Sequence, residues 1–272
     1  MKFKVGLCQI RPDKDPAKNY KAAKCQIKKA KDGGAVMVTL PEIWTTSYAP
    51  YYCLKYAEEP EGKAYQVLQQ AAKDNEIWVF GGSMPVKTED PMKITNTCFV
   101  FNPKGECMGR YDKLHPFDAD SYAGITTKES AFTQLGDHKL IIETEYCKVG
   151  VTICYDVRFP AYFNHLAAQG CKVMMVPSAY SRQTGERHWD ILTQGRALDC
   201  QAYLVGCQAG RNEENSYVTY GHSHVVDPFG FIIDELGEGE GVLVTELDMD
   251  LVDDIRRGLP IRTHERHEIY GY

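Results

Sequence analysis

The sequence contains no apolar run long enough to cross a lipid bilayer and no excess of basic residues. Its longest apolar stretches have the length of single strands, whereas a membrane-spanning helix needs about 20 apolar residues. The 31 lysine and arginine residues are outnumbered by 37 aspartate and glutamate residues, giving a net charge of −6 that argues against binding to nucleic acid. Residues 1–10 alternate like a strand and lack the apolar core of a secretion signal. We therefore expect a cytoplasmic protein without membrane or nucleic-acid partners.

Closely spaced cysteine pairs are also missing. The chain has ten cysteines in 272 residues, but no two of them form a C-x-x-C pair, which argues against a structural zinc site or a dithiol redox pair. Their low density argues against a disulfide framework, so most should be reduced, buried thiols. His222 and His224 could share one face of a strand. No cysteine or carboxylate at matching spacing accompanies them, which favours structural roles, and we expect no metal site.

Linkers rich in proline and serine, internal repeats and low-complexity segments are absent as well, so we predict a single domain over residues 1–272. Short β-branched runs alternate with amphipathic stretches, which is typical of an α/β fold with helices covering a sheet. The last thirty residues are polar and predict mostly loop. The predicted strands are 3–10, 35–40, 77–80, 95–101, 107–111, 149–153, 172–176, 202–207, 222–226 and 242–247, and the predicted helices are 19–30, 65–74, 161–169 and 188–201.

The segment 148–160 carries the clearest chemical signal. The β-branched run 149–153 predicts a buried strand, and it is followed at once by Cys154 and by Pro160, a residue favoured in the first turn of a helix. A side chain at such a strand–turn–helix junction is held at the carboxyl edge of a sheet, where nucleophiles commonly lie. The alternative is that Cys154 is a small buried apolar residue, as most free cysteines are.

Two more predicted strands end in chemically complementary residues, Glu42 and Lys113. A thiol with an ordinary pKa near ~8.5 needs a base or a cationic neighbour to become a nucleophile at neutral pH. A buried carboxylate could accept its proton, and a lysine could face a developing oxyanion. Each residue taken alone also fits a structural role, since Glu42 could cap a loop and Lys113 could pair with Asp112 on the surface.

An aromatic-rich loop over residues 43–57 follows the strand that ends before Glu42. Such loops often pack against the edge of a core. The position of this loop at the carboxyl end of a strand instead favours a pocket-lining role for part of it, and we predict that Tyr48 contacts the substrate.

Three motifs together resemble the signatures of the nitrilase (carbon–nitrogen hydrolase) superfamily: Leu40-Pro41-Glu42, the segment 111–115 (YDKLH) and the segment 153–160 (ICYDVRFP). They occur in the order and at the separations found in that family. The resemblance implies a four-layer α-β-β-α sandwich. It also implies a homodimer or higher homo-oligomer, and the helix after Pro160 and the helix from His188 are the natural contact elements.

The resemblance further implies that Cys154 is the nucleophile, Glu42 the general base and Lys113 a stabiliser of the tetrahedral intermediate. Glu129 would be the second glutamate of the family, which orients the lysine or positions substrate. The backbone N–H of Tyr155 would be the other oxyanion donor. The reaction implied is hydrolysis of a small-molecule amide through a cysteine thioester, with no cofactor.

Within the superfamily, the Cys-Tyr-Asp-x-Arg-Phe motif and the short chain are most similar to the ω-amidase group, whose members deamidate dicarboxylate monoamides such as α-ketoglutaramate. A carboxylate-bearing substrate needs a cation, and Arg158 is the best-placed candidate. The alternative role for Arg158 is a structural pair with Asp156 or with another carboxylate near this turn.

Departures from the ω-amidase pattern at Pro116, at Ala161 and in the segment 45–48 leave other substrates open. A deaminated-glutathione amidase or an N-carbamoyl-amino-acid hydrolase would carry the same catalytic residues. A non-catalytic binding member of the fold is the alternative from another class of protein.

Overall fold

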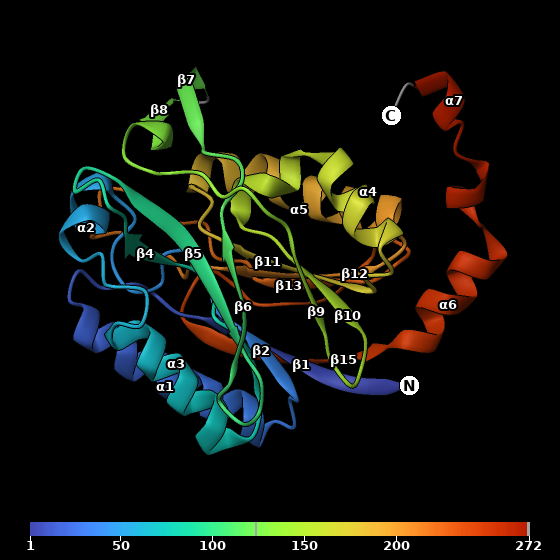
Figure 1. Ribbon diagram of the computed structural model, residues 1–272, viewed down its shortest axis with the longest axis horizontal. Coiled ribbons are helices and arrows are strands. Elements are labelled where there is room, and N and C mark those ends of the chain that lie inside the picture. Colours follow the sequence, from blue (N-terminus) through green and yellow to red (C-terminus); the bar gives the residue numbers. More distant parts are fainter. Residues whose placement is uncertain (123, 271–272) are drawn as a thin grey trace.

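The protein is built from two β-sheets packed face to face (Figure 1). The computed structural model describes residues 1–122 and 124–270. The seven-stranded sheet contains, in spatial order, β15 (Gly241–Asp248), β1 (Lys2–Gln9), β2 (Met37–Thr39), β3 (Trp78–Phe80), β5 (Ile94–Phe101) and β4 (Met84–Lys87), with β6 (Cys107–Asp112) also paired to β5. The six-stranded sheet contains β14 (Ile232–Glu235), β13 (His224–Val226), β12 (Tyr203–Gln208), β11 (Val173–Ser178), β10 (Lys148–Val151) and β9 (Leu140–Glu143).

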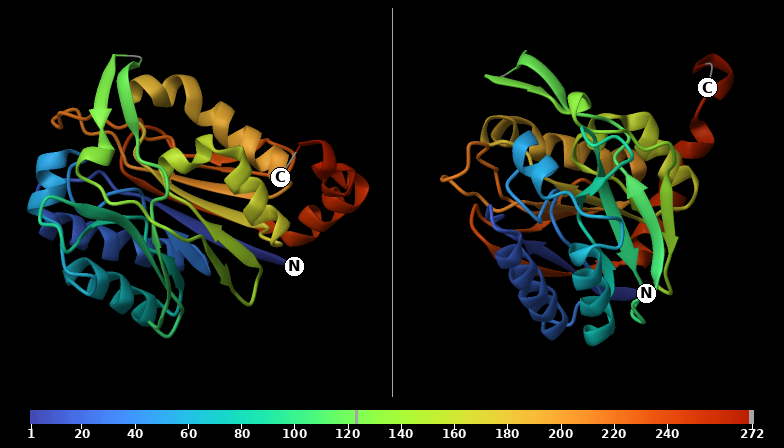
Figure 2. Two further views of the ribbon diagram at one scale, coloured as in Figure 1. Left: turned by 45° about the horizontal axis from the view of Figure 1, so that its top comes forward. Right: turned by 60° about the vertical axis from the view of Figure 1, so that its left-hand side comes forward.

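Helices cover the outer side of both sheets (Figures 1 and 2). Helices α1 (Pro16–Asp32) and α3 (Lys63–Asn75) lie on the seven-stranded sheet, and α4 (Pro160–Ala168) and α5 (Arg182–Cys200) lie on the six-stranded sheet. The layers therefore follow the order α-β-β-α, which confirms the predicted sandwich. The remaining elements are α2 (Pro50–Lys55), α6 (Met249–Gly258), α7 (His267–Tyr270), the 3-10 helices η1 (Glu129–Ala131), η2 (Cys154–Arg158) and η3 (Ile261–His264), and the hairpin of β7 (Asp118–Tyr122) and β8 (Ile125–Lys128).

The alternating side chains of β1 explain how the layers fit together. Phe3, Val5 and Leu7 enter the apolar cluster that the two sheets share, as their period-2 spacing predicts. Gly6 faces the other way, toward α1. A Cβ atom at Gly6 would lie 2.7 Å from Cβ of Ala30, so glycine permits the close approach of this helix to the strand. The strand–helix–strand unit is also as predicted, because β1 and β2 pair in parallel.

Four predictions about the elements were wrong in part. The helix predicted from residue 188 begins at Arg182, because the Ser181 side chain accepts a hydrogen bond from the backbone N–H of Thr184 and caps it there. The C-terminal part is not mostly loop: α6 forms behind the N-cap Asp248, and its charged residues surround a buried face. The aromatic loop contains the short helix α2, and β13 starts at residue 224 instead of 222.

Segments from both sheets come together at one edge of the sandwich. Glu42 follows β2 in one sheet and Cys154 follows β10 in the other. The backbone N–H of Glu42 donates to the carbonyl of Ser178, the last residue of β11, at 3.4 Å. This edge therefore joins the two layers and places chemically active side chains near each other. Within residues 1–122 and 124–270, no helix is long and apolar enough to cross a membrane.

Candidate active site

Cys154 lies at a sharp turn between a strand and a helix. Strand β10 ends at Val151, and both the backbone N–H and the hydroxyl of Thr152 donate to the carbonyl of Met175, which fixes the chain just before the turn. Cys154 then adopts a φ of +47°, a conformation that residues other than glycine, asparagine and aspartate rarely adopt. Such strain costs about 1–3 kcal/mol and is concentrated at functional sites. The predicted strand–turn–helix order is correct, with η2 between the strand and α4.

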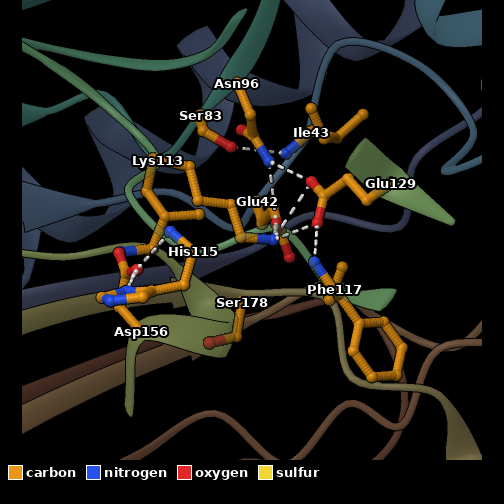
Figure 3. Close-up of polar contacts among 12 residues, drawn as sticks. Glu42, Ile43, Ser83, Asn96, Lys113, His115, Phe117, Glu129, Asp156 and Ser178 are labelled. Atoms are coloured by element: carbon orange, nitrogen blue, oxygen red, sulfur yellow. Dashed lines mark hydrogen bonds and ion pairs between the residues drawn. The ribbon is translucent and has the colours of Figure 1, made fainter. Parts of the chain in front are cut away.

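Glu42 is held almost without exposure to solvent, at 1 %. The next residue, Ile43, has a φ of +50°, and its backbone N–H donates to the Ser83 hydroxyl at 3.0 Å (Figure 3). The left-handed turn directs the carboxylate inward, into the space between the strand ends. There, the Oε1 atom of Glu42 accepts from Nζ of Lys113 and from Nδ2 of Asn96, each at 2.9 Å.

Lys113 connects two carboxylates. Its Nζ lies 2.9 Å from Oε1 of Glu42 and 2.8 Å from Oε2 of Glu129, and all three side chains are buried (Figure 3). Nζ also lies 3.1 Å from Oε1 of Glu129, so the ammonium group contacts both oxygens of that carboxylate. Glu129, at the start of η1, also accepts from the backbone N–H of Phe117 at 2.6 Å. We refer to Glu42, Lys113 and Glu129 as the charge cluster.

Asn96 is a residue of the site to which the sequence analysis gave no role. It lies in β5, and its side-chain amide donates to Glu42 at 2.9 Å and to Glu129 at 3.4 Å. Its backbone carbonyl accepts from the N–H of Lys113 at 2.9 Å. The strand Ile94–Phe101 is buried throughout, so the side-chain amide of Asn96 within it needs hydrogen-bond partners. A polar amide in a buried strand was the signal that could have indicated its role.

The charge cluster holds two carboxylates against one ammonium group. Burial acts to lower the pKa of Lys113, but the charges of Glu129 and Glu42 outweigh it and raise that pKa well above its usual range. Burial raises the pKa of Glu42, the positive charge of Lys113 opposes this, and the negative charge of Glu129 adds to it. Lys113 is therefore a permanent cation, and Glu42 has an increased affinity for a proton.

The Cys154 thiol stays protonated at neutral pH in this setting. Burial raises its pKa well above the ordinary value, Glu42 raises it further, and Lys113 lowers it. Glu42 and the Cys154 thiol share a hydrogen bond, and Oε2 of Glu42, which is buried, has no other partner within the described residues. The site thus combines a neutral thiol with a nearby carboxylate oxygen that is free to accept a proton, which is the arrangement required for general-base activation.

A second network joins the segment of Lys113 to the segment of Cys154. Buried Asp156 accepts from the Tyr111 hydroxyl at 2.6 Å and from the backbone N–H of Ile153 at 2.8 Å. Its Oδ1 atom lies 2.7 Å from Nδ1 of His115 (Figure 3). Asp156 is two residues after the cysteine and His115 is two residues after the lysine, so this network fixes the relative position of both groups.

A small cavity opens onto Cys154. The free space in it is about 10 Å³, roughly the volume occupied by one water molecule, so side chains must move to admit a substrate. The lining residues are Phe117, Cys154, Tyr155, Arg158, Tyr180, Thr184 and Tyr217.

Arg158 lies in the wall of this cavity without a carboxylate partner among residues 1–122 and 124–270. Its alternative role as a partner of Asp156 is wrong, because Asp156 bonds to Tyr111, Ile153 and His115. Its guanidinium instead donates to Nδ1 of His188 at 3.1 Å.

The surroundings of Arg158 keep its charge uncompensated. Burial lowers the pKa of His188, and the charge of Arg158 lowers it further, so the imidazole is neutral and can accept this bond. The guanidinium also faces the rings of Tyr155 and Tyr180, at 5.7 and 5.8 Å from their centroids. Arg158 is therefore a cation that a bound anion could reach.

The other predicted site residues occupy different positions. Tyr155 lines the cavity. Tyr48 is not one of the lining residues; its ring packs against Tyr217 at 4.9 Å, one layer behind the wall. Its contact with substrate remains a prediction. His222 and His224 both have partners: Nδ1 of His222 is 2.6 Å from Glu235, and Nε2 of His224 is 2.8 Å from the Thr193 hydroxyl. No group of three or more potential metal ligands occurs in the described part of the chain.

Known proteins show the same sequence pattern and fold. A family model described as carbon-nitrogen hydrolase matches residues 4–257. The omega-amidase NIT2 of Xenopus tropicalis is 38% identical over 270 residues, covering 99% of this chain and 97% of the relative. The human omega-amidase NIT2 is 35% identical over 269 residues, with the same coverage of 99% and 97%.

Solved structures agree with these matches. Saccharomyces cerevisiae Nit3, described as a member of branch 10 of the nitrilase superfamily, superposes with a TM-score of 0.87 at 34% identity, covering 95% of this chain and 94% of that chain. The C. elegans NitFhit protein superposes with a TM-score of 0.90 at 28% identity, covering 99% of this chain and 66% of that chain.

Two substitutions should shift the pKa of the Cys154 thiol in opposite directions. Glu42→Gln should lower the pKa of Cys154, because it removes the charge that raises this pKa. Lys113→Met should raise it, because the lysine lowers it. The measurement is the rate of iodoacetamide alkylation of the Cys154 peptide against pH, read by mass spectrometry. The exposed Cys25 is the internal control in the same samples. Midpoints that move in the same direction in both variants would contradict the account.

Proposed function

The chain belongs to the carbon–nitrogen hydrolase family, and from this membership and its site we propose that it is an ω-amidase. It hydrolyses a small carboxylate-bearing amide, of the type of α-ketoglutaramate, to the acid and ammonia. The observation that carries the proposal is the buried charge cluster beside a strained cysteine, together with Arg158 in the cavity wall. Its relatives named omega-amidase cover almost the whole chain, which supports the choice of substrate class.

In the first half-reaction, Sγ of Cys154 attacks the amide carbon while Glu42 accepts the thiol proton. The carbonyl oxygen becomes an oxyanion, which the positive charge of Lys113 and the backbone N–H of Tyr155 stabilise. Glu42 then passes its proton to the departing nitrogen, so that the C–N bond breaks and ammonia leaves. The acyl group stays on the cysteine as a thioester.

In the second half-reaction, the ionised Glu42 accepts a proton from a water molecule that attacks the thioester. The C–S bond breaks, the proton returns to Cys154, and the carboxylic acid leaves. Glu129 keeps Lys113 in place through a hydrogen bond at 2.8 Å. Glu129 is itself held by the backbone N–H of Phe117. The cycle consumes one amide and one water and requires no cofactor.

The substrate's distal carboxylate binds to Arg158. A guanidinium with no carboxylate partner of its own can offer a charge-assisted hydrogen bond to a ligand anion, and the tight cavity favours a short, linear chain between the two ends. Tyr48 supports this wall through its ring contact with Tyr217.

We also infer that the protein forms a homodimer through an exposed apolar surface. This surface comprises Ile191 and Leu198 of α5, Phe229 and Phe231 of the turn after β13, and Leu259 after α6, each at least half exposed. A largely apolar groove of about 550 Å³ lies among Leu198, Phe229 and α6, far from Cys154. Contiguous apolar patches of this kind are typical of protein interfaces. The proposed contact surface of each subunit includes α5, one of the two helices expected from the sequence.

Ammonia release from a substrate panel tests the catalytic proposal. The panel contains dicarboxylate monoamides, neutral short amides, N-carbamoyl amino acids and nitriles. Wild-type protein should release ammonia fastest from the monoamides, and Cys154→Ala should lower that rate by at least ~10³-fold while the circular dichroism spectrum is unchanged. Preference for N-carbamoyl amino acids would identify a carbamoylase instead. Wild-type protein that acts on no member of the panel would contradict the proposal and favour a binding protein.

Arg158→Lys should raise KM for a dicarboxylate monoamide by about 10–100-fold, because a lysine cannot reproduce the planar, two-pronged contact of the guanidinium. KM for a neutral amide of equal length should change little, which makes this amide the matched control. Steady-state kinetics with both substrates provide the measurement. Equal effects on both would remove Arg158 from substrate binding.

The dimer is tested by sedimentation velocity at several protein concentrations. Leu198→Glu together with Phe229→Glu should convert the wild-type dimer to a monomer, since two buried charges per subunit are costly in an apolar interface. Ser216→Glu, an exposed position outside this surface, is the control and should leave the dimer intact. A wild-type protein that sediments as a monomer at all concentrations would contradict the inference.

A further inference from the structure

Tyr180 lies in the cavity wall, and the reaction described above gives its hydroxyl group no role. It follows β11, and its backbone is fixed from two sides: its N–H donates to Oε1 of Gln208 at 2.9 Å, and its carbonyl accepts from the N–H of Tyr220 at 2.9 Å. Its ring packs against Trp189 at 5.2 Å. The position of the side chain is therefore determined by the protein and does not depend on a ligand.

The hydroxyl group of Tyr180 has no hydrogen-bond partner among residues 1–122 and 124–270, although the residue is only 5 % exposed. Buried hydroxyl groups nearly always form a hydrogen bond. A buried hydroxyl without one destabilises the folded protein by the full free energy of removing that group from water. A second tyrosine in the same wall shows the usual situation. The Tyr217 hydroxyl donates to the carbonyl of Ala179 at 2.9 Å.

The surroundings of this hydroxyl point to an anionic acceptor. The guanidinium of Arg158 lies 5.8 Å from the Tyr180 ring centroid, and both residues line the cavity with Cys154. Burial raises the pKa of Tyr180, with a further contribution from Cys154, so the phenol remains a hydrogen-bond donor over the whole neutral range. Thr184, also in the wall, cannot take this role as readily, because its hydroxyl already bonds to Ser181 at 3.0 Å.

We propose that Tyr180 is a specificity-determining residue: its hydroxyl donates a hydrogen bond to the distal carboxylate of the substrate, beside Arg158. This proposal rests on the proposed function for the identity of the substrate's tail. One carboxylate oxygen then faces the guanidinium and the other accepts from the phenol, so the unbonded hydroxyl is satisfied only when a substrate with an anionic tail is bound. A neutral tail leaves it unsatisfied, and a site that requires a hydrogen-bond acceptor discriminates strongly against ligands without one.

The test compares Tyr180→Phe with Tyr217→Phe. In Tyr180→Phe, KM for a dicarboxylate monoamide should rise about tenfold or more, kcat should change little, and KM for a neutral amide of equal length should stay constant or fall. The melting temperature should not decrease, because no internal hydrogen bond is lost. Tyr217→Phe should instead lower the melting temperature and leave the preference between the two amides unchanged. An equal loss on both amides in Tyr180→Phe, or a lowered melting temperature with an unchanged preference, would overturn the proposal.

A binding measurement separates this inference from the proposed function. Glutarate retains the tail carboxylate of a dicarboxylate product, and butyrate lacks it. Calorimetry should show that wild-type protein binds glutarate more tightly than butyrate and that Tyr180→Phe reduces this preference about tenfold or more. If that result is obtained from a protein that releases no ammonia from any amide, the proposed function fails and the role of Tyr180 stands. Equal affinity of wild-type protein for both ligands, or an unchanged preference in Tyr180→Phe, would overturn the inference even in an active amidase.

Discussion

Two buried carboxylates that share one ammonium group are the constraint on which the site depends. The ion pairs of Lys113 at 2.9 and 2.8 Å hold together the end of β6, the segment that follows β2 and the start of η1. Removing one member of a buried ionic group typically costs about 3–5 kcal/mol, so the geometry of these segments is strongly coupled. The surplus negative charge is also the functional feature, because it raises the proton affinity of Glu42 next to a neutral thiol.

The hydrogen bonds of Asp156 connect the segment of the lysine to the segment of the cysteine. Asp156 bonds to Tyr111 and His115 on the side of the lysine and to Ile153 on the side of the cysteine. The strained φ of Cys154 is thus supported by the hydrogen bonds of Asp156, which is itself fully buried. In the proposed function, substrate choice depends on the wall of the cavity, which contains both a cation and an unbonded hydroxyl.

The sequence allowed prediction of those features that depend on local patterns. The alternation in residues 3–7 predicted which face of β1 is buried, and the β-branched run before Cys154 with Pro160 after it predicted the turn. Family motifs indicated Glu42, Lys113 and Glu129, and the structure places these three side chains in contact. Features that depend on packing could not be predicted. The start of α5 depends on one capping hydrogen bond of Ser181. In α6, the many charged residues obscure the amphipathic pattern in the sequence. The partners of Asp156 and the missing partner of Tyr180 are visible only in three dimensions.

In the proposed reaction, the charge cluster allows the neutral thiol of Cys154 to form a thioester. Intact-mass spectrometry of wild-type protein, quenched in acid within milliseconds of mixing with a dicarboxylate monoamide, tests it most directly. The account predicts a transient covalent adduct with the mass of the substrate minus ammonia, mapped to the Cys154 peptide and lost as turnover ends. Turnover without an adduct on Cys154, or with an adduct on another residue, would contradict it.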